Sequence, residues 1–114
     1  MRAAGSPDEA LRTLVDWHVT FALEHQALIV VQDRDWAALP QEAREKVRET
    51  QRRYVEVWVK QLRAIHPDLA PKQARASVHA TFGLLNSTPH SAFLEPGEMR
   101  GLLAGMAAKA LALS

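Results

Sequence analysis

The 114-residue sequence contains no cysteine. This absence excludes disulfide bonds, thiolate nucleophiles and cysteine-based zinc sites, and it fits a reducing compartment. No apolar run approaches the roughly 20 residues that a membrane-spanning helix needs. The first five residues lead directly into a charged helix start rather than a signal peptide. We therefore expect a cytoplasmic protein that has no membrane partner.

The sequence also lacks a dominant charge, because fourteen Lys and Arg nearly balance thirteen Asp and Glu. Composition alone therefore does not indicate a protein that binds nucleic acid directly. Hydrophobic residues make up 47% of the chain, which excludes disorder throughout its length. A chain of this size forms one domain and buries roughly two-thirds of the surface that it exposes when unfolded. We expect a single domain over residues 1–114.

Apolar periodicity and helix-start signals predict an all-α, orthogonal, bundle-like domain of five helices. These helices are predicted from Ser6 to about His25, within residues 26–36, and over residues 41–65, 71–85 and 96–113. The apolar run from Leu28 to Val31 also fits a short strand. We favour a helix there, because no other segment could pair with a strand and satisfy its backbone groups.

The last two predicted helices carry small residues on a second face. Gly101 and Gly105 are spaced i,i+4, with Ala104 and Ala108 beside them. Interior glycines cost up to ~1 kcal/mol each in helix propensity, and close packing against another helix would offset that cost. The helix over 71–85 carries a second apolar or small surface, formed by Ala76, Ala80, Gly83 and Leu84, so we expect it to contact both its own bundle and a second surface.

Aromatic and histidine side chains are candidates for the wall of an apolar ligand pocket, because such pockets combine aromatic surfaces with a few polar groups. The candidate ligand-binding residues are Trp17, His18, Phe21, His25, Trp36, Tyr54, Trp58, His79 and Phe82. The periodicity of the first helix places both His18 and His25 on its buried face. The same side chains also fit a filled core in which the histidines are hydrogen-bonded.

Neither a metal site nor a catalytic site is expected. His18 and His25 are seven residues apart, whereas a helical chelate uses an i,i+4 spacing. The sequence also contains neither a nucleophile-elbow motif nor a phosphate-binding glycine loop. We expect no cofactor, and a small enzyme or metalloprotein is the least favoured hypothesis.

The stretch Phe82–Ser91, with the sequence FGLLNSTPHS, follows a helix that begins at Pro71. This stretch resembles a group of TetR-type transcriptional regulators common in actinobacteria. The amphipathic helix that contains Tyr54, Val55 and Trp58 is similar to the same pattern. The resemblance covers nearly the whole chain, and Phe82–Ser91 is its most specific part.

The resemblance implies a regulator, usually a repressor, with two parts. An N-terminal helix-turn-helix reads DNA, and a C-terminal helical domain binds a hydrophobic effector with a polar or thioester-linked head group. No helix-turn-helix precedes Ser6, so we expect this chain to represent the C-terminal part and not to bind DNA alone.

The resemblance further implies a homodimer in which the last two helices of each subunit form a four-helix bundle. The candidate interface residues are Ala80, Gly83, Leu84, Ser87, Gly101, Ala104, Gly105 and Ala108. The alternative hypothesis is a structural dimerisation module with a filled core and no effector.

Overall fold

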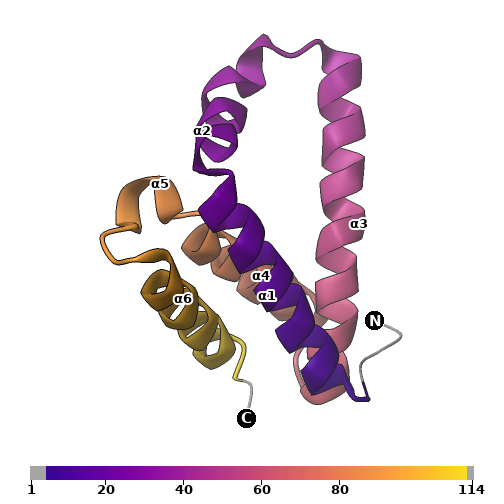
Figure 1. Ribbon diagram of the computed structural model, residues 1–114. Helices are drawn as coiled ribbons and strands as arrows, with labels where there is room; N and C mark the ends of the chain where they lie inside the picture. Colours follow the sequence, from indigo (N-terminus) through magenta and orange to yellow (C-terminus); the bar gives the residue numbers. More distant parts are fainter. Residues whose placement is uncertain (1–4, 113–114) are drawn as a thin grey trace.

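The computed structural model describes residues 5–112, which form six α-helices, one short 3-10 helix and no strand (Figure 1). The elements are α1 (Pro7–Glu24), α2 (Gln26–Asp35), η1 (Trp36–Ala38), α3 (Gln41–Ile65), α4 (Pro71–Leu85), α5 (Thr88–Ser91) and α6 (Pro96–Ala110). The all-α fold class is confirmed. None of these helices is both long and apolar enough to cross a bilayer.

The four longest helices form the bundle. α1 packs against α3 and α6, and α4 packs against the same two helices, so that α3 and α6 lie on opposite sides (Figure 1). α2 and η1 extend away from the bundle, and the N-terminal half of α3 extends beyond it in the same direction. The short α5 packs against α2. The molecule therefore consists of a packed bundle and, above it, an arch formed by α2, η1 and the N-terminal half of α3 (Figure 1).

Helix starts follow the signals in the sequence. At the start of α1, Ser6 accepts a hydrogen bond from the Glu9 N–H at 3.2 Å, and Pro7 occupies the first turn. Acidic residues in that turn also favour the positive end of the helix dipole. Proline likewise stands at the beginning of α4 and α6, where its missing N–H costs no helical hydrogen bond.

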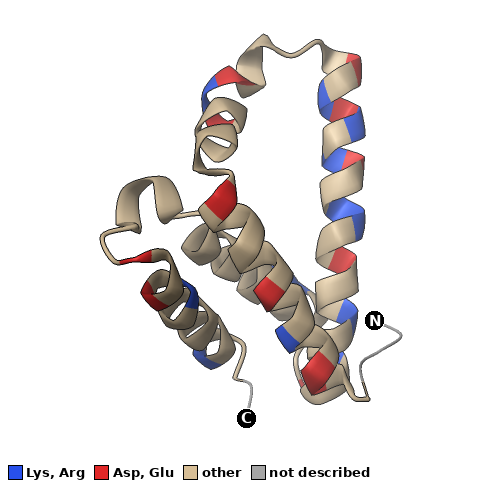
Figure 2. Ribbon diagram, viewed as in Figure 1, with Lys and Arg blue, Asp and Glu red and all other residues tan. Residues whose placement is uncertain are grey.

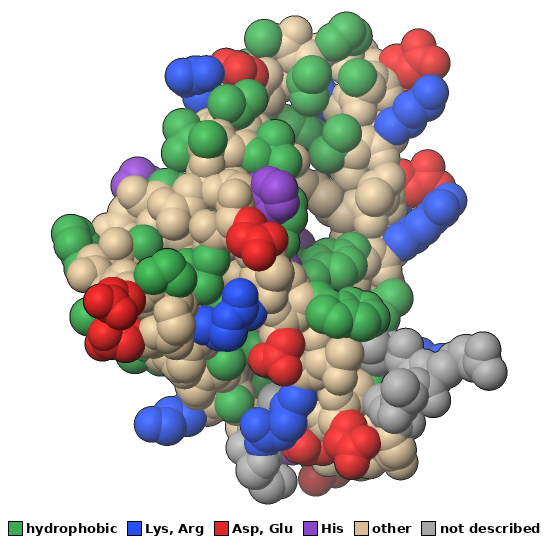
Figure 3. Space-filling model, viewed as in Figure 1, with side chains coloured by type: hydrophobic (Ala, Val, Ile, Leu, Met, Phe, Trp, Pro, Cys, Tyr) green, Lys and Arg blue, Asp and Glu red, His purple; other side chains and the backbone are tan. Residues whose placement is uncertain are grey.

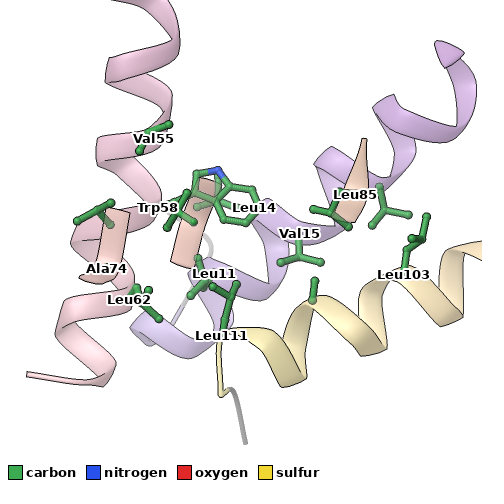
Figure 4. Packing of buried hydrophobic residues seen from close by; sticks show 14 of the residues in the cluster. Leu11, Leu14, Val15, Val55, Trp58, Leu62, Ala74, Leu85, Leu103 and Leu111 are labelled. Atoms are coloured by element: carbon green, nitrogen blue, oxygen red, sulfur yellow. The ribbon is translucent and has the colours of Figure 1, made fainter. Parts of the chain in front are cut away.

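The hydrophobic core lies where α1, α3, α4 and α6 meet. Trp58 is completely buried and reaches from α3 towards Leu14 of α1 (Figure 4). α6 closes the other side with Leu103 and with Leu111, which follows its last turn. Burying one large apolar side chain stabilises the fold by roughly 1.5–3 kcal/mol, so this cluster is the main source of stability.

The two halves of α3 lie in different environments. Val55, Trp58 and Leu62 are buried in the bundle, whereas Val47 and Tyr54, nearer its N-terminus, are each 37% exposed. The apolar stripe of α3, which runs from Val47 to Leu62, therefore packs into the core only in its C-terminal half. The N-terminal half faces the space beneath the arch.

The prediction of five helices missed α5, which lies between the helices predicted over 71–85 and 96–113. Thr88 is nearly fully buried, and its hydroxyl donates a 2.6 Å hydrogen bond to the Ala22 carbonyl of α1. The N–H groups of His90 and Ser91 donate to the Ser87 carbonyl, which closes a single helical turn. A tertiary contact stabilises a turn that local sequence signals did not reveal.

Three other expectations can be compared with the structure. The helix favoured over a strand at Leu28–Val31 is confirmed, since these residues lie in α2. The prediction that His25 is buried was wrong. α1 ends at Glu24, and His25 has non-helical backbone angles (φ −127°, ψ 41°) and is exposed. The last helix ends at Ala110, and its predicted end at Leu113 lies outside the described residues.

Replacing Leu11, which is fully buried in α1, with alanine should lower the free energy of unfolding by about 2–5 kcal/mol, because it removes apolar contacts and leaves a cavity. The matched control is Leu28→Ala in α2, since Leu28 is 43% exposed and should cost less than ~1 kcal/mol. Urea denaturation followed by circular dichroism measures both. Equal losses in the two variants would contradict this placement of the core.

Candidate ligand-binding cavity

A cavity of about 700 Å³ lies beneath the arch, between α1, α2, α3 and α4. On the face shown in Figure 3, hydrophobic side chains surround an opening between the arch and the bundle. The cavity forms because α3 packs tightly in the bundle and then continues past it. Its lining consists of Trp17, His18, Phe21, Ile29, Gln32, Thr50, Gln51, Tyr54, Val55, His79, Phe82 and Asn86.

Three stacked rings from three helices form one wall of the cavity. His18 and Phe82 stack with their centroids 4.9 Å apart, and Tyr54 stacks on Phe82 at 5.3 Å. Behind them, the buried Trp58 contacts Phe82 edge-on at 4.8 Å. Such aromatic pairs add about 0.5–1.5 kcal/mol beyond the area that they bury. The wall is therefore held rigidly by packing from the core.

His18 is the centre of a polar network within this wall. Its Nδ1 lies 3.0 Å from the Tyr54 hydroxyl, and its Nε2 lies 2.8 Å from Asn86 Oδ1. One arrangement satisfies all three groups: Nε2–H donates to the Asn86 carbonyl oxygen, and the Tyr54 O–H donates to Nδ1. In this arrangement the imidazole is neutral, and both of its nitrogens are occupied.

Burial controls the protonation of this network. It lowers the pKa of His18, although the hydrogen bond to Asn86 opposes the shift. Burial also raises the pKa of the Tyr54 hydroxyl, and the neighbouring Trp58 indole acts in the opposite direction. That indole remains outside hydrogen-bond geometry, so Trp58 Nε1 has no partner among the described residues. Both titratable groups therefore stay neutral near pH 7.

The cavity is aromatic and uncharged. No Asp, Glu, Lys or Arg is among the described residues that line it. The remaining polar groups are hydroxyl, amide and imidazole groups, which orient a ligand by hydrogen bonds without requiring a charge on it. This lining suits an apolar body, and a cavity of this size lies in the range of about 300–1,000 Å³ typical of small-molecule sites.

A second hollow of about 620 Å³ adjoins the cavity beneath α2 and η1. The two share Ile29, Gln32, Gln51 and Asn86, so they form a continuous space. Trp36 of η1 lines this second hollow, and the Arg48 guanidinium lies 5.5 Å from the centre of its ring.

The structure brings together most of the candidate ligand-binding residues. Six of the nine line the cavity: Trp17, His18, Phe21, Tyr54, His79 and Phe82. Trp36 lines the adjoining hollow, and Trp58 supports the wall from the core. His25 lies outside both linings, although its ring is 5.1 Å from Phe21.

Sequence analysis did not identify several polar residues of the lining as ligand-binding candidates. Gln51 interrupts the apolar stripe of α3. A polar residue at such a position indicates that this part of the stripe faces a polar group or a ligand and not the core. Asn86 follows the last residue of α4, where asparagine commonly ends a helix. Only the tertiary structure shows that Asn86 reaches His18.

The candidate interface residues lie on α4, α6 and the turn after α4. Ala80, Gly83, Gly101 and Gly105 are exposed, whereas Leu84, Ser87, Ala104 and Ala108 are half-buried. A Cβ atom added at Gly83, Gly101 or Gly105 would meet no atom within 4 Å. The described chain therefore gives these glycines no close packing partner. Ser87 already uses its hydroxyl, which donates to the Leu84 carbonyl at 2.6 Å.

Within residues 5–112, no group of three or more His, Cys, Asp or Glu side chains could hold a metal ion.

The chain matches a known family of protein domains over most of its length. The family model described as "Tetracyclin repressor-like, C-terminal domain" matches residues 4–90, which contain every residue of the cavity lining. No curated protein matches the chain.

The neutral state of His18 should make stability depend on pH. The unfolded chain binds a proton at His18 near the ordinary pKa of 6.5, whereas burial lowers the pKa in the folded protein. The unfolded state therefore binds more protons below about pH 6.5, and the folded protein loses stability as pH falls through that value. Compared with His18→Gln, the wild type should lose more unfolding free energy between about pH 7.5 and pH 5 in urea titrations. Parallel pH profiles would contradict a neutral, buried His18.

Proposed function

The chain belongs to the family of tetracyclin repressor-like C-terminal domains, and on this premise we propose that it is the effector-binding and homodimerising domain of a TetR-type transcriptional regulator. The observation that carries the proposal is the uncharged aromatic cavity between α1, α2, α3 and α4. In this proposal the domain binds a small hydrophobic molecule and performs no catalysis. Dimerisation uses the outer faces of α4 and α6.

The geometry of the cavity supports an effector site over a filled core. A structural dimerisation module does not require a 700 Å³ space lined by aromatic rings. Its rings are partly exposed, since Trp17 is 61% and Tyr54 is 37% exposed, and a bound apolar molecule would remove this apolar surface from water.

The arrangement of α4 and α6 supports the dimer. These two helices pack against each other at one side of the bundle, and both carry small residues on the side away from the core. Such a two-helix surface can pair with its copy through a twofold axis and form a four-helix bundle. Pairing would also offset the helix propensity that Gly83, Gly101 and Gly105 lose.

The cavity should bind a neutral, hydrophobic fluorescent probe such as N-phenyl-1-naphthylamine. Thr50→Trp places a large ring at the lining and should weaken binding at least tenfold, because the ring occupies the space that the probe needs. Fluorescence titration measures the affinity.

The matched control is Thr13→Trp on α1. Thr13 and Thr50 both donate a hydrogen bond to the carbonyl four residues earlier, but Thr13 does not line the cavity. This control should bind the probe like the wild type. Absence of binding to the wild type, or equal loss in both variants, would contradict an effector site here.

Gly105→Leu should convert the proposed dimer to a monomer without unfolding it. The added side chain points into open space in the single chain, and leucine has the better helix propensity by up to ~1 kcal/mol. At a close helix–helix interface, however, the same side chain would clash. Analytical ultracentrifugation measures the association state, and circular dichroism measures helix content.

Ala64→Leu is the control, because Ala64 is exposed on α3, which is not one of the two helices of the proposed interface. It should leave the dimer intact. A wild-type monomer at concentrations of about 100 μM, or a Gly105→Leu dimer as tight as the wild type, would rule out this interface.

A further inference from the structure

A basic groove of about 500 Å³ lies on the outer side of α3 and α4. Its lining is Arg48, Gln51, Arg52, Val55, Glu56, Arg75 and His79. Folding places two arginines of α3 in one groove with an arginine from α4. The Lys and Arg of α3 appear as blue bands along that helix in Figure 2.

The basic groove and the cavity meet at the same side chains. Gln51, Val55 and His79 line both spaces. Gln51 and His79 are exposed, whereas Val55 is buried at the edge of both spaces. A molecule whose body occupies the cavity can therefore extend one end past these three residues into the groove.

The groove has a surplus of positive charge. Three guanidinium groups face one carboxylate, that of Glu56, which leaves an excess of two positive charges. Arg75 is paired with Glu56 at 2.7 Å, and Arg48 lies over the Trp36 ring. Arg52 makes no ion pair or hydrogen bond within the described residues, so its guanidinium is available to an incoming anion.

The opposite end of the space offers no comparable charge. Asp33 and Asp35 line the second hollow, but Arg34 pairs with Asp35 at 3.1 Å. Among the described residues, that leaves one carboxylate without an ion pair there, Asp33, against the surplus of two positive charges in the groove.

From this arrangement we infer that the ligand is an amphipathic anion. Its uncharged apolar body lies in the aromatic cavity, and its carboxylate or phosphate lies in the basic groove against Arg52. Guanidinium groups suit both anions, because their N–H groups match the geometry of carboxylate and phosphate oxygens. This inference rests on the proposed function of the cavity and adds the chemical class of the ligand.

Four probes that share an eight-carbon chain test the inference by isothermal titration calorimetry at low salt. They are octanoate, octyl phosphate, 1-octanol and octyltrimethylammonium. At least one of the two anions should bind about tenfold more tightly than octanol, and the cation more weakly than octanol. Which anion binds more tightly distinguishes a carboxylate ligand from a phosphate ligand. The advantage of the anion should shrink as salt increases, because the groove is exposed to solvent.

Arg52→Gln should remove most of the preference for the anion, about tenfold in affinity, and leave octanol binding unchanged. Arg53→Gln is the matched control. It removes the same charge from the adjacent position, but Arg53 is paired with Glu49 at 2.6 Å and lies outside the groove. The control should bind all probes like the wild type.

The outcomes separate this inference from the proposed function. If octanol binds as tightly as both anions, or if Arg52→Gln and Arg53→Gln behave alike, the anionic class is wrong and the effector cavity stands. If octyltrimethylammonium binds best, the ligand is cationic and the inference is overturned. If none of the four probes binds, both the effector cavity and this inference fail.

Discussion

The packing of Trp58 is the interaction on which the rest of the structure depends. Below this residue, α3 is held in the bundle by Val59 and Leu62, and the core is closed by residues of α1, α4 and α6. At the level of Trp58, the indole supports the stacked rings of His18, Tyr54 and Phe82. Beyond it, α3 separates from the bundle. One buried side chain therefore contributes to the core on one side and to the wall of the cavity on the other.

The polar network extends from that wall towards the proposed dimer face. His18 of α1 contacts Asn86 at the end of α4, and the next two residues form further bonds: Ser87 with Leu84, and Thr88 with Ala22 of α1. A ligand that displaces the Phe82 or His18 ring therefore acts directly on the end of α4. Gly83 and Ala80 also lie on α4. The same helix therefore lines the cavity and contributes to the proposed dimer face. This connection gives the proposed regulator a physical route between effector and dimer.

Sequence periodicity predicted the helices well, because apolar spacing and proline positions act locally. It also predicted that His18, Tyr54 and Phe82 belong together, since each lies on an inward face of its own helix. The prediction of a buried His25 was wrong, because α1 ends at Glu24. His25 is therefore outside the helix, and the helical periodicity no longer sets the direction of its side chain. α5, Asn86 and the basic groove could not be predicted, because each depends on contacts between helices: Thr88 with α1, Asn86 with His18, and Arg75 beside Arg52. Periodicity shows which face is inward, but not where an inward face meets empty space.

In the proposed function, this domain holds a small molecule in the cavity while two copies pair through α4 and α6. Native mass spectrometry of the purified protein, repeated under denaturing conditions, tests both parts together. We expect a dimer that carries additional non-covalent mass as purified, or that gains such mass when a ligand is added. This additional mass should disappear on denaturation. A monomer that acquires no mass from any added amphipathic anion or neutral analogue would contradict the account.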